Sequence, residues 1–271
     1  MPKPLPMLDL PSVSLICLDT RDPDLAVYAM QRCLAQARFG EAILLTKTGY
    51  QSPDPRIQAV PVAPIRNIAE YSAFMVRDLG QHFTGSHALV MQWDSFVLDA
   101  QAWDPAFLDY DYIGAPWPDR AHPVGNGGFS LRSARLYRAL QDERITDFQP
   151  EDYCICDLHH DLLVTEHGIR FAPLDMARRF AFELEAPPGP CFGFHGLFNF
   201  YRALPDAELV PYLEGLTERA LRSMQGRRLL KNLIAQQRRA PAEILLTARA
   251  RGSFKERIDA LKLRLRLALK G

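Results

Sequence analysis

Long apolar runs are missing from this 271-residue sequence, in which no stretch approaches the roughly 20 apolar residues that a membrane-spanning helix needs. The first six residues, Met-Pro-Lys-Pro-Leu-Pro, lack the apolar segment of a secretory signal. Cysteines are few, and their odd number, five, argues against a disulfide framework. These absences favour a cytoplasmic protein in a reducing compartment.

A net charge is also missing, because 32 Lys and Arg balance 32 Asp and Glu, but the two ends of the chain differ. From Arg219 onward there are 15 basic and 3 acidic residues, a net charge of +12, which leaves −12 on residues 1–218. Such a division predicts that the basic end meets an anionic surface. There is no nucleic-acid recognition motif, only charge, so we expect no nucleic-acid partner.

The first elements predict a parallel sheet. Residues 13–18 form a buried strand, a helix with Asp22 as its cap runs to about residue 38, and residues 41–46 form a second strand. Ligands of such sheets lie beyond the carboxyl ends of the strands. This places Asp19 and Thr20 near a nucleotide, with ordinary loop residues as the alternative.

The next elements lead to an exposed acid. Residues 56–62 predict a third strand, and helical spacing from Ile68, with Asn67 as the cap, predicts an amphipathic helix of about 15 residues. Residues 87–97 then predict a central strand, apolar on both faces until it emerges near its end. Asp94 lies at that point, where its carboxylate would either face a ligand or close a turn.

Three glycines in four positions, 125–128, precede a Phe-Ser-Leu-Arg alternation. Glycine lets another group approach the backbone closely, so we predict that Gly127 and Gly128, next to Asn126, contact a ligand. Arg132 would contact a phosphate or pair with an acid. Just upstream, Trp117 would line a sugar site together with Trp103 and Tyr112, or only wedge its Pro-rich loop onto the core.

An acid pair, Glu151-Asp152, follows Pro150 at the start of a predicted helix. The acids could serve only to stabilise the helix, because negative charge suits the positive end of the helix dipole. The glycine turn upstream favours a functional role for them instead. The helix is expected to bury Ile155, Leu158 and Leu162. Its Cys-x-Cys and His-His pairs do not predict a zinc site, because cysteines two positions apart on a helix do not face each other.

The order of apolar strand, acid, glycine turn and acid pair resembles metal-dependent glycosyltransferases of the GT-A fold. The likeness rests on Gln92-Trp93-Asp94, on Gly127–Ser130 and on Glu151-Asp152. Over about residues 13–200 the chain looks closest to an uncharacterised bacterial glycosyltransferase-like family, with a weaker likeness to animal β-1,3- and β-1,4-galactosyltransferases. Gln92 departs from the family pattern, because it replaces the first acid of the triplet and puts metal dependence in question.

The resemblance implies an α/β fold, a GT-A-like mixed sheet flanked by helices, over residues 1–204. It implies transfer of a sugar from a nucleotide-sugar donor to an acceptor hydroxyl, in the synthesis of a bacterial surface polysaccharide. Asp94 and His195 would bind Mn²⁺ or Mg²⁺, Asp152 would be the base, and Glu151 would hold acceptor hydroxyls. The implied donor-binding residues are Asp19, Thr20, Gln92, Asp94, Trp117, Asn126, Gly127, Gly128 and Arg132.

A non-catalytic nucleotide- or glycan-binding protein with a degenerate metal site is the alternative function, and Gln92 is the residue that favours it. A simple assay distinguishes the two functions, because an enzyme should slowly hydrolyse some nucleotide sugar without an acceptor.

Residues 205–271 are predicted to be a helical, basic region. Phe254, Ile258, Leu261 and Leu265 recur on one face of the last helix, with Arg and Lys around them. Such a helix suits an anionic membrane surface, which would make this a peripheral protein on the inner face of the membrane with a lipid-linked acceptor. Packing on the catalytic domain or on a second subunit is the alternative.

Overall fold

The structure is a computed structural model that describes residues 7–269. Residues 1–6, inspected above for a signal, and the last residue of the predicted tail helix, Lys270, lie outside the described residues. The chain divides into two compact units, residues 1–195 and residues 196–271. The sequence analysis placed this division at 204–205, and the catalytic and tail roles given to the two parts stay predictions.

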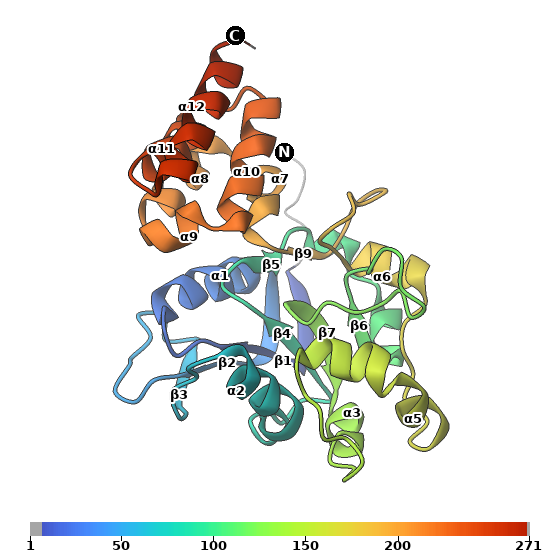
Figure 1. Cartoon of the computed structure of the whole chain (residues 1–271). Helices are drawn as coiled ribbons and strands as arrows, with labels where there is room; N and C mark the ends of the chain where they lie inside the picture. The colour runs from blue at the N-terminus through green and yellow to red at the C-terminus, as the bar shows by residue number, and fades with distance from the viewer. Residues whose placement is uncertain (1–6, 270–271) are drawn as a thin grey trace, which may run out of the picture. The chain divides into compact units, whose positions relative to one another are not determined.

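A six-stranded mixed sheet in the order β3-β2-β1-β4-β7-β6 forms the centre of unit 1, residues 1–195 (Figure 1). Four strands run parallel: β1 (Leu8–Leu18), β2 (Ala37–Thr46), β3 (Gln58–Pro61) and β4 (His87–Met91). The strand β7 (Phe129–Ser133) pairs antiparallel with both β4 and β6 (Tyr112–Gly114). This arrangement confirms the predicted α/β class with a mixed sheet flanked by helices.

Helices cover both faces of the sheet. The main apolar core lies under α2 (Ile68–Ala73), α3 (Ala134–Ala139), α4 (Glu151–Tyr153) and α5 (His160–Thr165). On the other face, α1 (Pro23–Gln36) packs its Cys33 against Met91 of β4. A second, three-stranded sheet lies beside α1, with β5 (Ser95–Val97) next to β9 (Gly193–His195) and β9 next to β8 (Ala181–Phe182), which directly follows α6 (Leu174–Phe180).

Three predicted boundaries in the first βαβ unit change, the first being that β1 begins at Leu8 instead of residue 13. The helix ends at Gln36, and β2 begins at Ala37 instead of residue 41. Asp22 occupies the cap position but makes no side-chain cap bond. Instead, Oδ1 of Asp19 accepts hydrogen bonds from the backbone N–H groups of Arg21 and Asp22, at 2.8 Å each. The predicted cap at Asn67 is confirmed by its hydrogen bond from Glu70 N.

The single strand predicted over residues 87–97 is wrong, because β4 ends at Met91 and β5 belongs to the second sheet. A tight turn separates them. The backbone N–H of Gln92 donates to Ser95 Oγ at 2.9 Å, and the N–H of Ser95 donates to the Gln92 carbonyl at 3.1 Å. The Ser95 hydroxyl also donates to the Gly128 carbonyl at 2.8 Å, which holds the turn against the glycine stretch.

Both predicted long helices contain a π-helical turn. The helix from Ile68 continues as a π turn over Phe74–Asp78, and the helix from Glu151 as one over Cys154–Leu158. A π turn shifts which side chains face inward. Ile155 and Leu163 are therefore fully buried, while Leu158, predicted to be buried, is 46% exposed.

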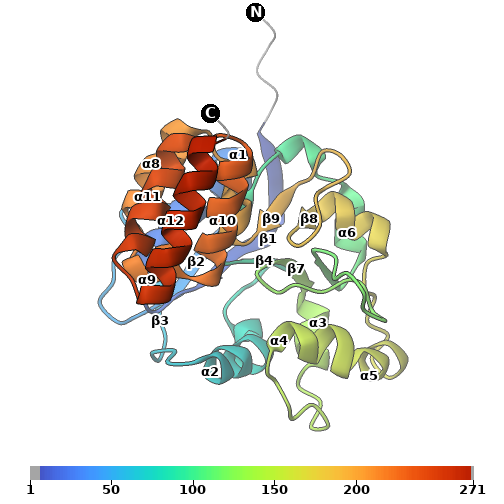
Figure 2. The same cartoon turned by 45° about the horizontal axis from the view of Figure 1, so that its top comes forward.

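Unit 2, residues 196–271, contains one 3₁₀ turn followed by α-helices and their connections over its described residues, 196–269 (Figure 2, orange to red). This confirms the predicted helical C-terminal region. Its α-helices are α7 (Phe200–Ala203), α8 (Asp206–Glu214), α9 (Glu218–Arg222), α10 (Met224–Ala235), α11 (Arg239–Ala250) and α12 (Phe254–Leu269). Between residues 7 and 269 no helix has the length and apolar character needed to cross a membrane.

Candidate functional site

The carboxyl ends of β1 and β4 form the natural place for a ligand. The chain leaves β1 toward β2 on one side, while β4 is its neighbour on the other, so the direction of winding reverses between them. Ligands of open α/β sheets bind at this switch point. Cys17 pairs with Met91 in the register, so Asp19 and Asp94 follow at the same edge. Burial raises the pKa of the Cys17 thiol, and the two carboxylates raise it further.

His195 lies beside Asp94 because β5 and β9 are paired. Their antiparallel register sets Ser95 opposite His195 and so brings a late segment of unit 1 to the end of β4. Nε2 of His195 is 3.4 Å from Asp94 Oδ1 and 3.2 Å from Gln92 Oε1. Three of the residues predicted from the sequence therefore meet at one ring nitrogen.

The other ring nitrogen of His195 faces residues that the metal prediction did not include. Nδ1 lies 3.3 Å from Glu183 Oε1 and 3.2 Å from Asn126 Nδ2. Burial alone would lower the pKa of His195, but Asp94 and Glu183 outweigh it and raise the pKa to about 10. The two carboxylates thus favour positive charge at this position, which the protonated ring supplies here and which a divalent cation in place of the Nε2 proton would also supply.

Tyr71 fixes the orientation of Gln92. Its hydroxyl accepts a hydrogen bond of 2.9 Å from Gln92 Nε2, and the amide carbonyl then faces His195 Nε2. Tyr71 and Glu183 were missed as site residues by the sequence analysis. Tyr71 was counted among the apolar positions of a helix, and no motif marks Glu183, because it reaches the site only through the pairing of β8 with β9.

Side chains of the site occupy the space that a Cβ atom would need at Gly127 and Gly128. A Cβ on Gly128 would lie 2.3 Å from Nε2 of His195, and a Cβ on Gly127 would lie 2.0 Å from Oε1 of Glu151. Asn126, with φ of +57°, is buried, and its Oδ1 has no hydrogen-bond partner among the described residues. Close packing thus explains both glycines, while their predicted contact with a donor sugar stays a prediction.

Asp152 is held at the same turn. Its Oδ2 accepts a hydrogen bond of 3.2 Å from the backbone N–H of Gly127, and its Oδ1 accepts one of 2.9 Å from Tyr153 N. The residue is only partly buried. Two backbone donors thus hold this partly exposed carboxylate in place, while its predicted role as a base stays a prediction.

Glu151 forms a buried ion pair with Arg132. The Arg132 side chain is fully buried, and its Nη2 lies 3.2 Å from Glu151 Oε1 and 3.3 Å from the Gly127 carbonyl. Burial raises the pKa of Glu151, with Asp152 adding to the rise and Arg132 opposing it. Of the two alternatives given for Arg132, the structure shows pairing with an acid.

The remaining predicted residues lie in different surroundings. Thr20 is partly buried, and its Oγ1 accepts a hydrogen bond of 3.0 Å from Ile65 N. Trp117 covers Gly125, and the guanidinium of Arg120 lies 5.7 Å from its ring centroid. Tyr112 is fully buried and Trp103 packs on Phe107 and Phe192. The burial of Tyr112 corrects its suggested place in a sugar site, while the place suggested for the partly buried Trp103 stays a prediction.

The residues around Nε2 of His195 suit a divalent cation. A carboxylate oxygen, an amide oxygen and an imidazole nitrogen are all established ligands of divalent metals. Ligands of one octahedral ion with bonds of about 2.1 Å lie about 3 Å apart, close to the separations found here. Glu183 on Nδ1 matches the carboxylate that orients most metal-binding histidines. These residues would hold a cation without a second acid in the triplet.

A second group of metal-ligand side chains lies away from this turn. Ligand atoms of His122, His160 and Asp161 are all within 4.8 Å of one another. However, the two imidazole rings stack at a centroid distance of 3.6 Å and an angle of 18°. None of these three residues belongs to the predicted site, and Asp161 is exposed, so we do not assign the proposed cation to this group.

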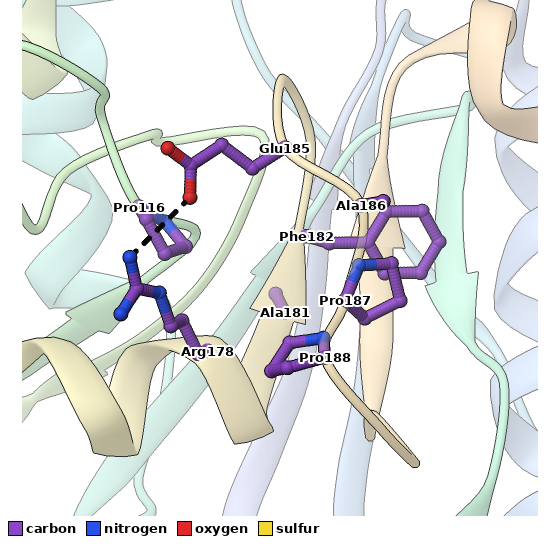
Figure 3. Close-up of a pocket in the computed structure, with 8 residues that line it drawn as sticks. All are labelled: Pro116, Arg178, Ala181, Phe182, Glu185, Ala186, Pro187 and Pro188. Atoms are coloured by element: carbon purple, nitrogen blue, oxygen red, sulfur yellow. Dashed lines mark ion pairs between the residues drawn. The ribbon is translucent and has the colours of Figure 1, made fainter.

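A hollow beyond β8 is too small for a donor. Arg178, Phe182, Glu185 and prolines 116, 187 and 188 are among its lining residues, and Figure 3 shows Glu185 turned toward Arg178, at 3.7 Å. Its volume of about 10 Å³ holds about one water molecule. Pockets for drug-sized ligands measure about 300–1,000 Å³, so this hollow is not a nucleotide-sugar site.

Replacing Gly128 by Ala should disturb the site directly. The added Cβ would overlap the His195 ring, so we expect a loss of about 1–3 kcal/mol in the free energy of unfolding, or a displaced ring and weaker Mn²⁺ binding. Gly189→Ala is the control, because nothing lies within 4 Å of its Cβ position. Urea unfolding and Mn²⁺ calorimetry measure both effects. Equal values for the two variants would show that His195 and Gly128 are not packed as described.

A family model covers the part of the chain that contains the site. The family described as "Protein of unknown function (DUF5672)" matches residues 54–195, just over half of the sequence. The chain belongs to this family. The DUF5672 region ends at His195, so it includes Gln92, Asp94, the glycine turn and the acid pair, and it excludes β1, α1, β2 and unit 2. Curated proteins offer no match.

Among solved structures, the matches of this DUF5672 chain include glycosyltransferases. The galactosyltransferase LgtC with donor and acceptor sugar analogs is 13% identical, with a TM-score of 0.45, covering 67% of this chain and 86% of LgtC. The mannosyltransferase PcManGT of Pyrobaculum calidifontis with GDP-Man and Mn²⁺ is 14% identical, with a TM-score of 0.39, covering 99% and 84%. Mouse xyloside xylosyltransferase 1 is 12% identical, with a TM-score of 0.43, covering 73% and 100%. Function is therefore inferred below from the side chains of the site.

Proposed function

We propose that this protein is a metal-assisted glycosyltransferase, which moves a hexose from a nucleotide-sugar donor to an acceptor hydroxyl. The observation that carries the proposal is the meeting of Asp94, Gln92 and His195 at one ring nitrogen, at the end of β4 and beside the glycine turn. This is the edge of the sheet where α/β proteins bind nucleotides. The resemblance of the same motifs to GT-A glycosyltransferases supports it.

Asp94 and His195 would hold Mn²⁺ or Mg²⁺, with the amide oxygen of Gln92 as a neutral third ligand. Such an ion supplies positive charge to the diphosphate leaving group. Tyr71 keeps the Gln92 carbonyl directed at the site, and Glu183 keeps the His195 ring in place from its other nitrogen. The replacement of an acid by Gln92 is thus compatible with metal binding.

Asp152 would accept the proton of the acceptor hydroxyl. Two backbone N–H groups hold its carboxylate beside the glycine turn, so the proton can be taken at a fixed position. Glu151 lies next to Asp152 in the chain and pairs with Arg132, which it is proposed to hold in position. Glu151 is also proposed to hold acceptor hydroxyls. Both residues keep the polar groups of the turn in one arrangement.

The proposed donor contacts come from two loops, in addition to the turn that holds Gln92 and Asp94. Asp19 and Thr20 follow β1, where Asp19 carries a pKa raised mainly by burial. Asn126 offers a buried amide oxygen without a partner among the described residues, which suits a sugar hydroxyl or a phosphate-bound water. Gly127, Gly128 and Trp117 complete the proposed donor site. The acceptor would be a glycan or lipid-linked precursor of a bacterial surface polysaccharide.

Metal-dependent nucleotide binding tests the site. Asp94→Ala should weaken the binding of UDP or GDP in the presence of Mn²⁺ at least tenfold, because one of the two strong ligands is lost. Asp9→Ala removes an exposed carboxylate paired with Arg38 and serves as the control, with unchanged affinity. Isothermal titration calorimetry with Mn²⁺ and with chelator separates the cases. Wild-type binding that is equally tight with chelator would refute the metal assignment.

The alternative function is non-catalytic binding of a nucleotide or glycan. Gln92 favours it, because the metal site then has one acid fewer than the family pattern. Both functions predict nucleotide binding, and only the enzyme predicts cleavage of the donor. The decisive measurement is therefore turnover.

A further inference from the structure

The last helix of unit 2 carries an outward-facing apolar stripe. Five of its side chains are 73, 40, 62, 57 and 86% exposed, in the order Phe254, Ile258, Leu261, Leu265 and Leu269. Their spacings of four, three, four and four residues keep them on one side of an α-helix. An exposed row of this kind marks an interaction surface rather than scattered surface residues.

The stripe is not the face that packs α12 into unit 2. Ala260, Leu263 and Leu267 are buried, and they lie on the opposite side of the helix from Leu261 and Leu265. Arg227 and Arg249 also bind Asp259 of α12, at 2.6 and 3.0 Å. The inner face therefore anchors the helix in unit 2, and this packing does not use the apolar stripe. This packing is on other helices of unit 2, so the sequence alternatives of membrane binding and of packing on the catalytic domain or a second subunit both stay predictions.

Basic side chains flank the stripe on both sides. Lys255, Lys262 and Arg266 lie along one edge, and Arg257 and Arg264 along the other. Within residues 7–269 only Arg264 among these five has an acidic ion-pair partner, Glu243 at 2.6 Å. Two copies packed stripe against stripe would bring these like charges together. The charge pattern instead complements an anionic surface.

A groove opens beside the stripe within unit 2. It has a volume of about 420 Å³ and is lined by Lys231, Ile234, Ala235, Leu263, Arg266 and Leu269 of α10 and α12. The lining is apolar except for the two bases, and it contains no acid. Leu269 and Arg266 belong to both the groove and the stripe with its flank. Apolar walls with a basic rim suit a phospholipid, whose acyl chain would contact the walls and whose phosphate would face the bases.

We propose that α12 is a membrane-surface helix, whose stripe enters the headgroup region of an anionic phospholipid bilayer while the groove beside it takes an acyl chain. The five stripe residues supply the apolar contact, and the flanking Lys and Arg face the lipid phosphates. This surface is independent of the proposed sugar transfer, because every residue in it belongs to unit 2. It gives the basic end of the chain a specific, outward-facing contact rather than a diffuse charge.

Vesicle binding by the full-length chain tests the proposal. Leu261→Gln together with Leu265→Gln should lower co-sedimentation with phosphatidylcholine–phosphatidylglycerol vesicles at least tenfold, while circular dichroism stays unchanged. The matched control is Leu158→Gln with Val164→Gln, two exposed apolar residues of unit 1, which should bind as the wild type does. Lys262→Gln with Arg266→Gln should weaken binding to the anionic vesicles and leave the weak binding to pure phosphatidylcholine unchanged.

Three results would overturn it. The first is a stripe variant that binds anionic vesicles as tightly as the wild type. The second is wild-type binding that is equal on neutral and anionic vesicles. The third is a wild-type dimer in light scattering that becomes monomeric in the stripe variant without any change in vesicle binding, because the stripe would then contact a second copy.

Discussion

Replacing Asp152 by Asn is expected to lower turnover of the donor by about 10²–10⁴-fold, the usual loss when a general base is removed. Asn keeps the shape of the side chain and an oxygen that can accept the hydrogen bond from Gly127 N. The fold and nucleotide binding should therefore stay nearly intact. Turnover is measured as nucleoside diphosphate released from the donor, and binding by calorimetry.

Asp175→Asn distinguishes catalysis from a helix-dipole effect. Asp175 is an exposed acid in the first turn of α6, so it matches Asp152 as an N-terminal helix charge and has no contact with the site. If Asp152 acts only on the dipole, the two variants should behave alike. Each should lose about 0.3–1 kcal/mol in the free energy of unfolding and keep the turnover of the wild type. That result would remove Asp152 from the mechanism.

Replacing Arg132 by Met is expected to cost about 3–5 kcal/mol in the free energy of unfolding. The substitution leaves the carboxylate of Glu151 buried without its partner, and an uncompensated buried charge is strongly destabilising. It also removes a hydrogen bond to the Gly127 carbonyl and so loosens the turn that holds Asp152. Urea unfolding measures the loss.

A double variant and a surface control make this prediction specific. Arg132→Met combined with Glu151→Gln should recover much of the lost stability, because the unpaired charge is gone. Arg38→Met breaks an exposed pair with Asp9 and should leave the free energy of unfolding nearly unchanged, because solvent screens such a pair. A single Arg132→Met variant as stable as Arg38→Met would show that the pair is not buried as described.

Local patterns predicted the elements around the site well. Asn67 was recognised as a cap, and its side chain accepts a backbone hydrogen bond from Glu70, three positions on. The buried strand that begins at His87 was also predicted, because β4 is apolar on both faces, but it ends at Met91, and Asp94 is buried rather than exposed as predicted. These features depend on residues close together in the chain. The spacing of apolar residues and the residue type at the cap position therefore predict them directly.

Contacts between residues far apart in the chain could not be predicted from the sequence. Glu183 reaches His195 through the pairing of β8 with β9, and nothing in the sequence specifies that register. The π-helical turn that exposes Leu158 likewise leaves no pattern to recognise. The burial of Arg132 was unforeseen for the same reason, since its partner Glu151 follows 19 residues later in another element.

The most direct test of the central claim is the release of nucleoside diphosphate from UDP- and GDP-linked hexoses by the full-length protein with Mn²⁺ and no acceptor. The proposed enzyme should slowly cleave one of these donors, and chelator, Asp94→Ala and Asp152→Asn should each abolish that cleavage. Donors that all stay intact, while UDP or GDP still binds, would contradict the account and leave a non-catalytic nucleotide-binding protein.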